Sequence, residues 1–249
     1  MTREKVVTSI GNLISEIELI YSSQNYILWF RGHSDKGWPL IPSVQRNGLN
    51  KNEQCISNDF YIKSSIRMRD KPNKNDYAGW MALMQHYGLP TRLLDWSKSP
   101  LIAAYFATCE YGEYPDKDAC IWILKPGLLN ECEGFNGYIY PMDTSTVLEM
   151  IFPAFKPYKD FKRDVEDKII ACYPVENDLR MYTQQSAFTL HNSFKKLEQL
   201  NISHLVEKII IPFSVKKKIL NELRICGIEL STVYPDIEHV SREIKDYYR

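Results

Sequence analysis

Twelve consecutive residues concentrate more chemistry than any other part of this chain: Gln85-His86-Tyr87-Gly88-Leu89-Pro90-Thr91-Arg92-Leu93-Leu94-Asp95-Trp96. Gly88 stops a helix that ends at Tyr87, and Leu93 begins a short strand, so the block predicts a helix-turn-strand unit. A core segment places its charges singly and paired, because a buried charge is costly without a partner. The crowding of ionisable groups therefore predicts a functional site.

The segments on either side extend this unit. Before it, the spacing of apolar residues predicts helices over Glu53–Met68 and Tyr77–Tyr87, the second capped by Asn75 or Asp76. After it, Ser99-Pro100 is typical of an N-cap followed by proline at the first helical position, which opens a further helix. The carboxylate near the end of the block is thereby placed at a junction between a strand and a helix.

The N-terminal part predicts a helix and then a strand. Apolar residues recur at helical spacing from Lys5 to Tyr21, which indicates an amphipathic helix. Tyr26–Phe30 is a short aromatic and β-branched run that ends at Arg31-Gly32-His33, where glycine permits a sharp exit. Arg31 is therefore expected at the end of a strand, before a loop that reaches residue 52.

Strand patterns dominate the later part of the chain, and helices close it. Strands are predicted over 119–124, 168–173, 185–190 and 206–211, with a helix over 144–151. Ser214 is expected to cap a helix that ends at Cys226-Gly227, and Asp236 to cap a terminal helix. Without a repeat or a clear linker, residues 1–249 are predicted to form one α+β domain. Its parts are an N-terminal helix at 5–21, a strand and loop at 26–52, a helical insert at 53–87, the site block at 85–107, and a sheet with C-terminal helices at 119–249.

Composition limits the classes of protein. With 249 residues, 44% hydrophobic and 25% charged, the chain is typical of a globular protein, and 31 basic residues balance 31 acidic ones. No global charge therefore favours nucleic acid or an anionic membrane. The six cysteines form no C-x-x-C pair, which favours a reducing cytoplasm and no metal site. No signal peptide opens the chain, and its longest apolar run, Leu101–Ala107, is too short for a membrane span, so a cytoplasmic protein is expected.

Each ionisable candidate has a structural interpretation beside the functional one. The Arg31 guanidinium grips a phosphate or carboxylate, or it forms an ion pair at a sheet edge. His86, Arg92 and Asp95 offer an acid/base group, an anion clamp and a carboxylate aimed at developing positive charge. Alternatively, Arg92 pairs with Asp95, and His86 interacts with a helix C-terminus. The position of Asp95 before a tryptophan and a helix start favours function for that residue.

Other polar patterns leave similar alternatives open. Arg180 and Gln184-Gln185-Ser186 precede an apolar run and offer groups that hydrogen-bond a sugar or carboxamide, although paired glutamines also occur on exposed strand edges. Rings and lysines alternate with a period of three in Phe155–Lys162, which suits single-stranded nucleic acid or a solvated helix. P-loop, dinucleotide-binding, zincin and serine-hydrolase motifs are absent from the sequence.

The motifs resemble those of the FRG-domain family, which is named for the tripeptide Phe30-Arg31-Gly32. The resemblance takes in the Gln85–Trp96 block, the Ser99–Ala107 run, Gln184–Thr189, and the stretch from Gly227 to Asp236, so it covers nearly the whole chain. Within Gln184–Thr189, the family usually has glycine in place of Ser186. FRG domains are mainly microbial and are associated with phage defence or toxin-like systems. The resemblance therefore implies an effector with a partner protein or antitoxin in the same system.

The order of parts is more distantly similar to that of ADP-ribosyltransferases. This resemblance implies a mixed or antiparallel split sheet flanked by helices, and it implies NAD as the substrate. It implies that Arg31 holds the dinucleotide, that Asp95–Ser97 lines the nicotinamide side, and that Gln184-Gln185-Ser186 occupies the strand that usually carries a catalytic glutamate. No glutamate lies there, so either Asp95 performs that task or the fold binds a nucleotide without turning it over.

The leading hypothesis is an NAD-using ADP-ribosyltransferase-like or NAD-glycohydrolase-like glycosyltransferase. One carboxylate and a rigid diphosphate clamp supply much of the catalysis that cleavage of the nicotinamide–ribose bond needs. The expected catalytic residues are Asp95, Arg31, His86, Arg92 and Gln185, with His86 and Arg92 orienting Asp95. The expected nucleotide-binding residues are Arg31, Gly32, Tyr87, Thr91, Trp96, Ser97 and Gln184. A non-catalytic nucleotide- or partner-binding module and a nucleic-acid-directed effector remain alternatives, and the acceptor is a protein or a nucleic acid.

Overall fold

A single mixed sheet organises the molecule. The computed structural model describes residues 5–24, 27–156, 167–174, 179–200 and 202–248. Within these ranges, eight strands lie in the order β1-β8-β4-β2-β3-β7-β6-β5. The strands are β1 (Lys5–Val6), β2 (Trp29–His33), β3 (Leu93–Ser97), β4 (Ala119–Leu124), β5 (Tyr140–Pro141), β6 (Ile169–Tyr173), β7 (Ser186–His191) and β8 (Val206–Ile211). The described central strands pair antiparallel and the two short edge strands pair parallel, which confirms the predicted α+β class and mixed sheet.

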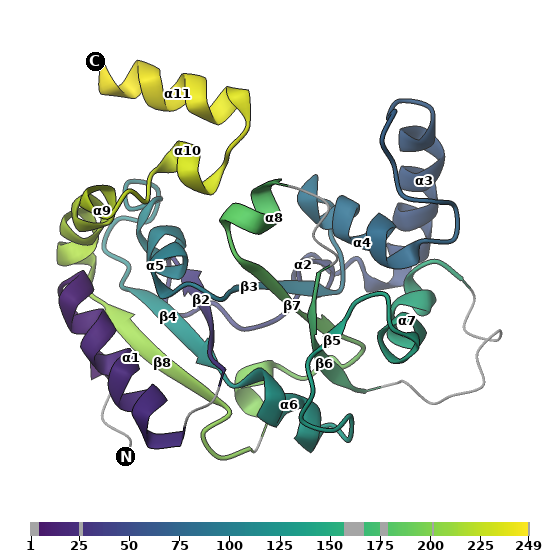
Figure 1. Cartoon of the computed structure of the whole chain (residues 1–249), viewed down its shortest axis with the longest axis horizontal. Coiled ribbons are helices and arrows are strands. Elements are labelled where there is room, and N and C mark those ends of the chain that lie inside the picture. Colours follow the sequence, from purple (N-terminus) through teal and green to yellow (C-terminus); the bar gives the residue numbers. More distant parts are fainter. Residues whose placement is uncertain (1–4, 25–26, 157–166, 175–178, 201, 249) are drawn as a thin grey trace.

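The sheet is split between β2 and β3. β2 pairs with β4 from Trp29↔Leu124 to His33↔Cys120, and β3 pairs with β7 along its whole length. Among the described residues, β2 and β3 share only the pair Phe30↔Ser97. One half of the sheet therefore holds β1, β8, β4 and β2, and the other holds β3, β7, β6 and β5 (Figure 1). We call the line between the halves the seam.

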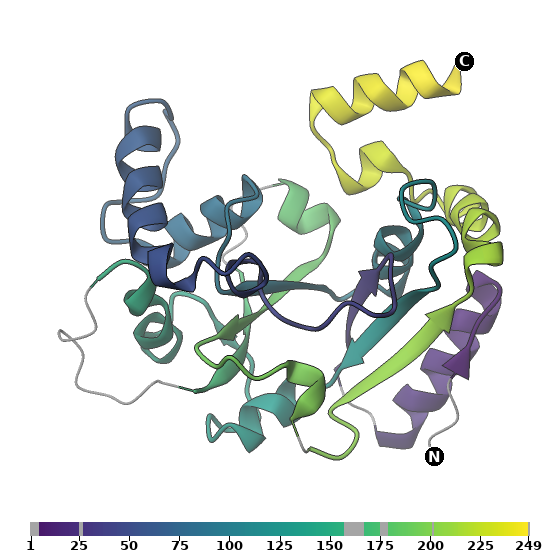
Figure 2. The ribbon, with the colours of Figure 1, turned by 180° about the vertical axis from the view of Figure 1, so that it is seen from behind.

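Three helices cover one face of the first half. Side chains of α1 (Ile10–Gln24), α5 (Pro100–Thr108) and α9 (Lys216–Ile225) pack with Phe30, Ile121 and Ile209 in one hydrophobic cluster. α10 (Leu230–Val233) and α11 (Ile237–Tyr247) follow α9, and no described side chain of α11 is buried. Figures 1 and 2 show α11 standing away from the sheet.

The second half has its own hydrophobic cluster. α4 (Tyr77–His86) and α7 (Ser145–Ile151) pack against Leu93, Ile170 and Phe188, with α3 (Glu53–Ser65) beyond α4. A third cluster lies on the opposite face and joins Trp29, Trp96 and other side chains to α6 (Pro126–Cys132). The short helices α2 (Ser43–Arg46) and α8 (Leu179–Thr183) lie near the seam.

Local signals placed many elements correctly. The bounds of β4 and β8 and the first residues of α3 and α4 are confirmed. The Asp76 side chain accepts a hydrogen bond from the Gly79 N–H (2.8 Å) and so caps α4. Ser99 caps α5, with Pro100 as its first residue, and Asp236 caps α11. These caps depend only on residues within one helical turn, which is why the sequence reveals them.

Three expectations at the ends of elements were wrong. The predicted helix at 5–21 begins only at Ile10, because Lys5–Val6 pairs with the β8 edge and Lys5 forms an ion pair with Glu207 (2.8 Å). Ser214 lies within a 3-10 turn, and no side chain caps α9. The expected loop up to residue 52 contains α2 and a further 3-10 turn at Asn50–Asn52.

The predicted end of the FRG strand also needs correction. Arg31 lies inside β2, opposite Trp122 of β4, because pairing with β4 continues to His33. Only the pairing with β3 stops before Arg31. Tyr26 and most of the predicted Phe155–Lys162 pattern lie outside the described residues. Within the described ranges, we find no helix with both the length and the apolar character needed to cross a membrane.

Candidate functional site

A pocket of about 300 Å³ lies in the seam, where β2 and β3 diverge. We call it the seam pocket. Both strands line it, β2 through Phe30–His33 and β3 through Asp95–Ser97, and residues from α5, α8 and the loops complete the wall. The predicted site residues that it brings together are Arg31, Gly32, Asp95, Trp96, Ser97 and Gln184.

Arg31 joins the two strands across the seam. Its Nη1 donates a hydrogen bond to the backbone carbonyl of Asp95 (2.6 Å) and lies 3.7 Å from Asp95 Oδ2. Its Nε donates to Nε2 of His33 (2.9 Å). Burial, assisted by the charge of Arg31, lowers the pKa of His33 to about 2, so this imidazole is neutral and can accept the bond. The guanidinium is thereby fixed from two directions.

The Asp95 carboxylate is both accessible and oriented. Its side chain is 52% exposed, and Gln85 Nε2 donates to Oδ2 (2.8 Å). The Thr91 hydroxyl in turn donates to Gln85 Oε1 (2.5 Å), which fixes the amide. Oδ1 makes no hydrogen bond to any described residue, so it is available to a ligand.

The pocket wall carries an excess of positive charge. Arg31, Arg46 and Arg180 line it, against the carboxylates of Asp95 and Glu110. Arg46 extends from α2, is exposed, and forms no ion pair within the described ranges. The Arg180 guanidinium lies over the ring of Tyr234, 4.5 Å from its centroid. Guanidinium groups in such a wall suit a phosphate-bearing ligand.

Gly32 allows α5 to pack closely on β2. A Cβ built at this position would lie 1.9 Å from the Ala103 carbonyl oxygen and 2.6 Å from the Ala107 nitrogen. No side chain fits between strand and helix there. The glycine of the FRG tripeptide is therefore explained by packing, and the same packing sets the depth of the seam pocket beside Ala103 and Phe106.

The remaining predicted residues in the pocket are held by hydrogen bonds. Ser97 Oγ donates to the Gln184 carbonyl (2.7 Å), and Gln184 Nε2 donates to the Val233 carbonyl (3.1 Å). Trp96 is buried, and its Nε1 donates to Thr189 Oγ1 (3.0 Å) on the opposite face. Ser97 and Gln184 thus connect β3, α8 and α10 around the pocket, whereas the Trp96 ring belongs to the core.

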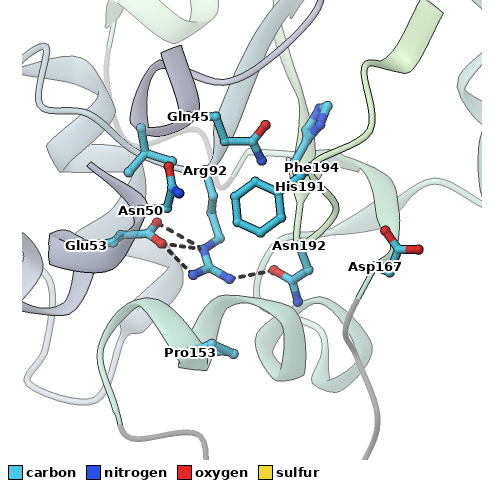
Figure 3. Close-up of a pocket in the computed structure, with 10 residues that line it drawn as sticks. Gln45, Asn50, Glu53, Arg92, Pro153, Asp167, His191, Asn192 and Phe194 are labelled. Carbon is cyan, nitrogen blue, oxygen red and sulfur yellow. Dashed lines mark hydrogen bonds and ion pairs between the residues drawn. The ribbon is translucent and has the colours of Figure 1, made fainter. Parts of the chain in front are cut away.

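Arg92 lies away from the seam pocket, which corrects both expectations about its link to Asp95. Its Nη2 and Nε bond to the Glu53 carboxylate (2.5 and 3.0 Å), and its Nη1 bonds to Asn192 Oδ1 (2.5 Å), as Figure 3 shows. Successive side chains of a strand point to opposite faces, so positions 92 and 95 cannot share one. Arg92 therefore neither pairs with Asp95 nor orients it.

Four other predicted residues do not line the seam pocket. His86 and Tyr87 face a different pocket beside the 68–73 loop. Thr91 is buried, and its hydroxyl is linked to Asp95 through Gln85, to which it donates a hydrogen bond. Gln185 is exposed with a φ of 49°, and its carbonyl accepts a hydrogen bond from the Lys98 N–H (2.9 Å). Its place is that of a turn residue before β7.

Several residues of the pocket escaped prediction from the sequence. Gln85 was part of the quoted block, but its bond to Asp95 depends on how α4 meets β3. Tyr234 lay in the closing stretch of the resemblance without a role. Arg46 and Glu110 carry no local signal, because only the fold brings α2 and the end of α5 to the seam.

The fold and the site define an α+β protein with a polar, arginine-rich pocket in a split sheet. Residues 26–115 match the family model of the FRG domain, so this segment of the chain is similar to FRG domains. The matched segment runs from β2 to just beyond α5 and includes Arg31, Gln85 and Asp95.

No curated protein and no solved structure gives a significant match to the chain. The resemblance to ADP-ribosyltransferases therefore stays a prediction. Among the described residues, no three or more His, Cys, Asp or Glu side chains are grouped so as to hold a metal ion.

Proposed function

We propose that the seam pocket binds NAD and that the protein cleaves the bond between nicotinamide and ribose, as an ADP-ribosyltransferase-like or NAD-glycohydrolase-like enzyme. The observation that carries this proposal is the juxtaposition of Arg31 and Asp95, a fixed cation and an accessible carboxylate in one pocket. NAD requires both kinds of group, because it carries a diphosphate and reacts through a cationic transition state.

The arginines supply the anion-binding side. Arg46 has no ion-pair partner among the described residues, and its charge acts on Arg31 across the pocket. Burial is the main reason why the pKa of Arg31 is lowered, and the repulsion from Arg46 adds to it, while Asp95 opposes the change. A diphosphate between Arg31 and Arg46 would relieve this repulsion through charge-assisted hydrogen bonds.

Asp95 supplies the carboxylate for the reaction. When the C–N bond breaks, its electron pair leaves with nicotinamide, and positive charge develops on the ribose. The free Oδ1 of Asp95 can stabilise that charge, since Gln85 and Arg31 already hold Oδ2. An acceptor nucleophile, or water in the hydrolase version, then bonds to the anomeric carbon and loses its proton.

Aromatic side chains offer surfaces for the two bases. Trp38, Phe106 and Tyr234 line the pocket, and Tyr234 already carries the Arg180 guanidinium on its face. These rings take the place of Tyr87 and Trp96, the two aromatic residues that the sequence analysis expected to bind the nucleotide. The predicted cytoplasmic location and the association with phage defence or a toxin system belong to the same proposal, and the acceptor is left as a protein, a nucleic acid or water.

A non-catalytic nucleotide-binding module is the second candidate. The β7 end of the pocket carries Gln184 and Ser186 rather than a carboxylate, and Arg31 already engages Asp95. In this version the same pocket senses a nucleotide and passes the signal to a partner protein. The nucleic-acid alternative rested on Phe155–Lys162, which lies mostly outside the described residues.

The two candidates separate in one experiment. Purified protein is incubated with NAD, and released nicotinamide is measured by chromatography, while ADP-ribose binding is measured by thermal shift. We expect nicotinamide release, a loss of about 100-fold in Asp95→Asn, and no loss in the surface control Asp59→Asn. Arg46→Ala is expected to weaken ADP-ribose binding. Binding without release supports the module, and the absence of both contradicts each version.

A further inference from the structure

The seam pocket holds a second carboxylate that the proposed reaction does not use. Glu110 follows the end of α5, is exposed, and lines the pocket together with Asp95. The Ser34 hydroxyl donates to Glu110 Oε2 over 3.3 Å. Among the described residues, this carboxylate has no other hydrogen bond and no ion pair. Glu110 therefore presents an accessible anion with free acceptor capacity to the pocket.

Glu110 and Asp95 belong to different parts of the pocket. Asp95 accepts the hydrogen bond of Arg31 across the seam, whereas Glu110 contacts Ser34, three residues further along the chain. β2 is extended as far as His33, and a strand rises roughly 3.3 Å per residue, so Arg31 and Ser34 are about 10 Å apart. A ligand that reaches both carboxylates must be elongated, as a dinucleotide is, with one ribose on either side of its diphosphate.

The chemistry of Glu110 suits hydroxyl groups. A carboxylate accepts hydrogen bonds and repels phosphate, so the diphosphate belongs with the arginines of the wall and not here. A cationic ligand group would face those same arginines. The two oxygens of a carboxylate match the two neighbouring hydroxyls of a ribose, and an acidic residue has this task in other dinucleotide-binding folds.

Aromatic rings lie close to this carboxylate. Phe106 precedes Glu110 by four residues, and its carbonyl accepts a hydrogen bond from the same Ser34 hydroxyl (3.3 Å). The Trp38 ring packs edge-on against Tyr114, four residues after Glu110, with 5.1 Å between the ring centroids. Phe106 and Trp38 both line the pocket. A base attached to a ribose at Glu110 thus has ring surfaces beside it.

We propose that Glu110 binds the 2′,3′-diol of the adenosine ribose and thereby selects NAD over NADP. The two hydroxyls donate to the carboxylate, whereas the 2′-phosphate of NADP brings a second anion against it. The nicotinamide ribose then lies at Asp95, with the diphosphate between Arg31 and Arg46. This inference rests on the proposed function of the seam pocket, and it adds which of the two dinucleotides the pocket accepts.

The test compares ADP-ribose with ADP-ribose 2′-phosphate by titration calorimetry, since neither carries nicotinamide and cleavage cannot interfere. The unmodified protein is expected to bind ADP-ribose at least about ten-fold more tightly. Glu110→Gln is expected to weaken ADP-ribose about ten-fold and to tighten the 2′-phosphate, because the variant loses the charged acceptor and the repulsion together. Glu113→Gln, an exposed glutamate of the same turn outside the pocket wall, is the matched control and should change neither affinity.

The opposite directions of these two changes separate diol binding from a general effect of charge. A carboxylate that acts only through its charge would repel both ligands, so Glu110→Gln would tighten both. That result, or equal affinities of the unmodified protein for the two ligands, would overturn the inference while the nucleotide site itself remained.

Removal of the 2′-hydroxyl gives an independent measure. The unmodified protein is expected to bind 2′-deoxy-ADP about five-fold more weakly than ADP, and Glu110→Gln is expected to bind the two almost equally. The same five-fold loss in both proteins would also overturn the inference.

Failure of the proposed function gives a different result. If none of the four ligands binds the unmodified protein, the seam pocket is not a nucleotide site, and both proposals are wrong. If the expected selectivity is observed but NAD releases no nicotinamide, the inference is supported and the pocket belongs to the non-catalytic module.

Discussion

The guanidinium of Arg31 donates a hydrogen bond to the backbone carbonyl of Asp95, 2.6 Å away. Arg31 is the next residue after Phe30, which forms the β2–β3 backbone pair with Ser97. A side chain thus continues the connection between the strands at the point where backbone pairing stops. The same contact places a cation and a carboxylate in one pocket, so the contact that joins the two halves of the sheet also forms part of the candidate site.

The close packing of α5 on β2 predicts that Gly32→Ala is severely destabilising. Its new Cβ would lie within 1.9 Å of the Ala103 carbonyl oxygen, and backbone cannot move aside without separating strand from helix. We expect a loss of about 3 kcal/mol or more in the free energy of unfolding, measured by urea denaturation. Gly112→Ala is the matched control, because a Cβ there meets no atom within 4 Å. Equal stability of the two variants would contradict the packing explanation.

The Arg92–Glu53 pair is expected to be structural. Glu53 is 4% exposed, so Arg92→Ala leaves a carboxylate buried without its partner. The expected cost is about 3–5 kcal/mol in urea denaturation, against about 0–1 kcal/mol for Lys63→Ala in the exposed Lys63–Asp59 pair. The double change Arg92→Met with Glu53→Leu should recover much of the loss. A small effect of Arg92→Ala would show that water reaches Glu53.

Two buried histidines predict a loss of stability in mild acid. Burial, and then the charge of Arg31, lowers the pKa of His33 to about 2 and that of His191 to about 3. In the unfolded chain both titrate near 6.5, so below that pH the unfolded state binds more protons, and stability decreases as the pH falls towards 3. Between about pH 7.5 and about pH 5.5, each histidine contributes a loss of about 1.4 kcal/mol.

Replacement of His33 tests this pH dependence. His33→Asn keeps an acceptor for Arg31 and removes one titrating group, so it should lessen the decrease between the two pH values by about half. Urea denaturation of both proteins at both pH values measures the difference. An unchanged pH dependence would mean that His33 is already protonated, or water-exposed, in the folded protein.

Gln85 is predicted to be a positioning residue for Asp95. Gln85→Leu removes the hydrogen bond to Oδ2, so the carboxylate is less well fixed when charge develops on the ribose. If NAD is the substrate, kcat for nicotinamide release should fall about ten-fold while KM changes little. Gln54→Leu is the control, because within the described part of the chain its amide donates to the carbonyls of residues 153 and 156, away from Asp95. A rise in KM alone would assign Gln85 to binding instead.

Local sequence patterns predict most of the helices and strands, but they do not predict how the side chains of the site meet. Ser99, Asp76 and Asp236 cap helices because their signals act within one turn. The strand at Lys5–Val6 was missed because it exists only beside the β8 edge. Boundaries of this kind depend on a partner far along the chain, which no local window contains.

The candidate site shows the same division. Arg31 and Asp95 were predicted together and do line one pocket. The separation of Arg92 from Asp95 is predictable from the sequence, because side chains three residues apart along an extended chain point to opposite faces of the sheet. Arg46, Glu110 and Tyr234 were beyond reach, since the segments that carry them meet only in the folded chain.

The single backbone pair Phe30↔Ser97 divides the sheet into two halves, which, with the helices that cover them, we call the two arms of the molecule. Each arm has its own hydrophobic cluster on the helix-covered face. The arms are joined by this backbone pair, by the Arg31 guanidinium, and by the third cluster on the opposite face, which contains both Trp29 and Trp96. α11 belongs to one arm and α3 to the other, at distant sides of the molecule in Figure 1. Both β2 and β3 line the seam pocket, so a molecule seated there would contact both arms and its binding would couple one arm to the other.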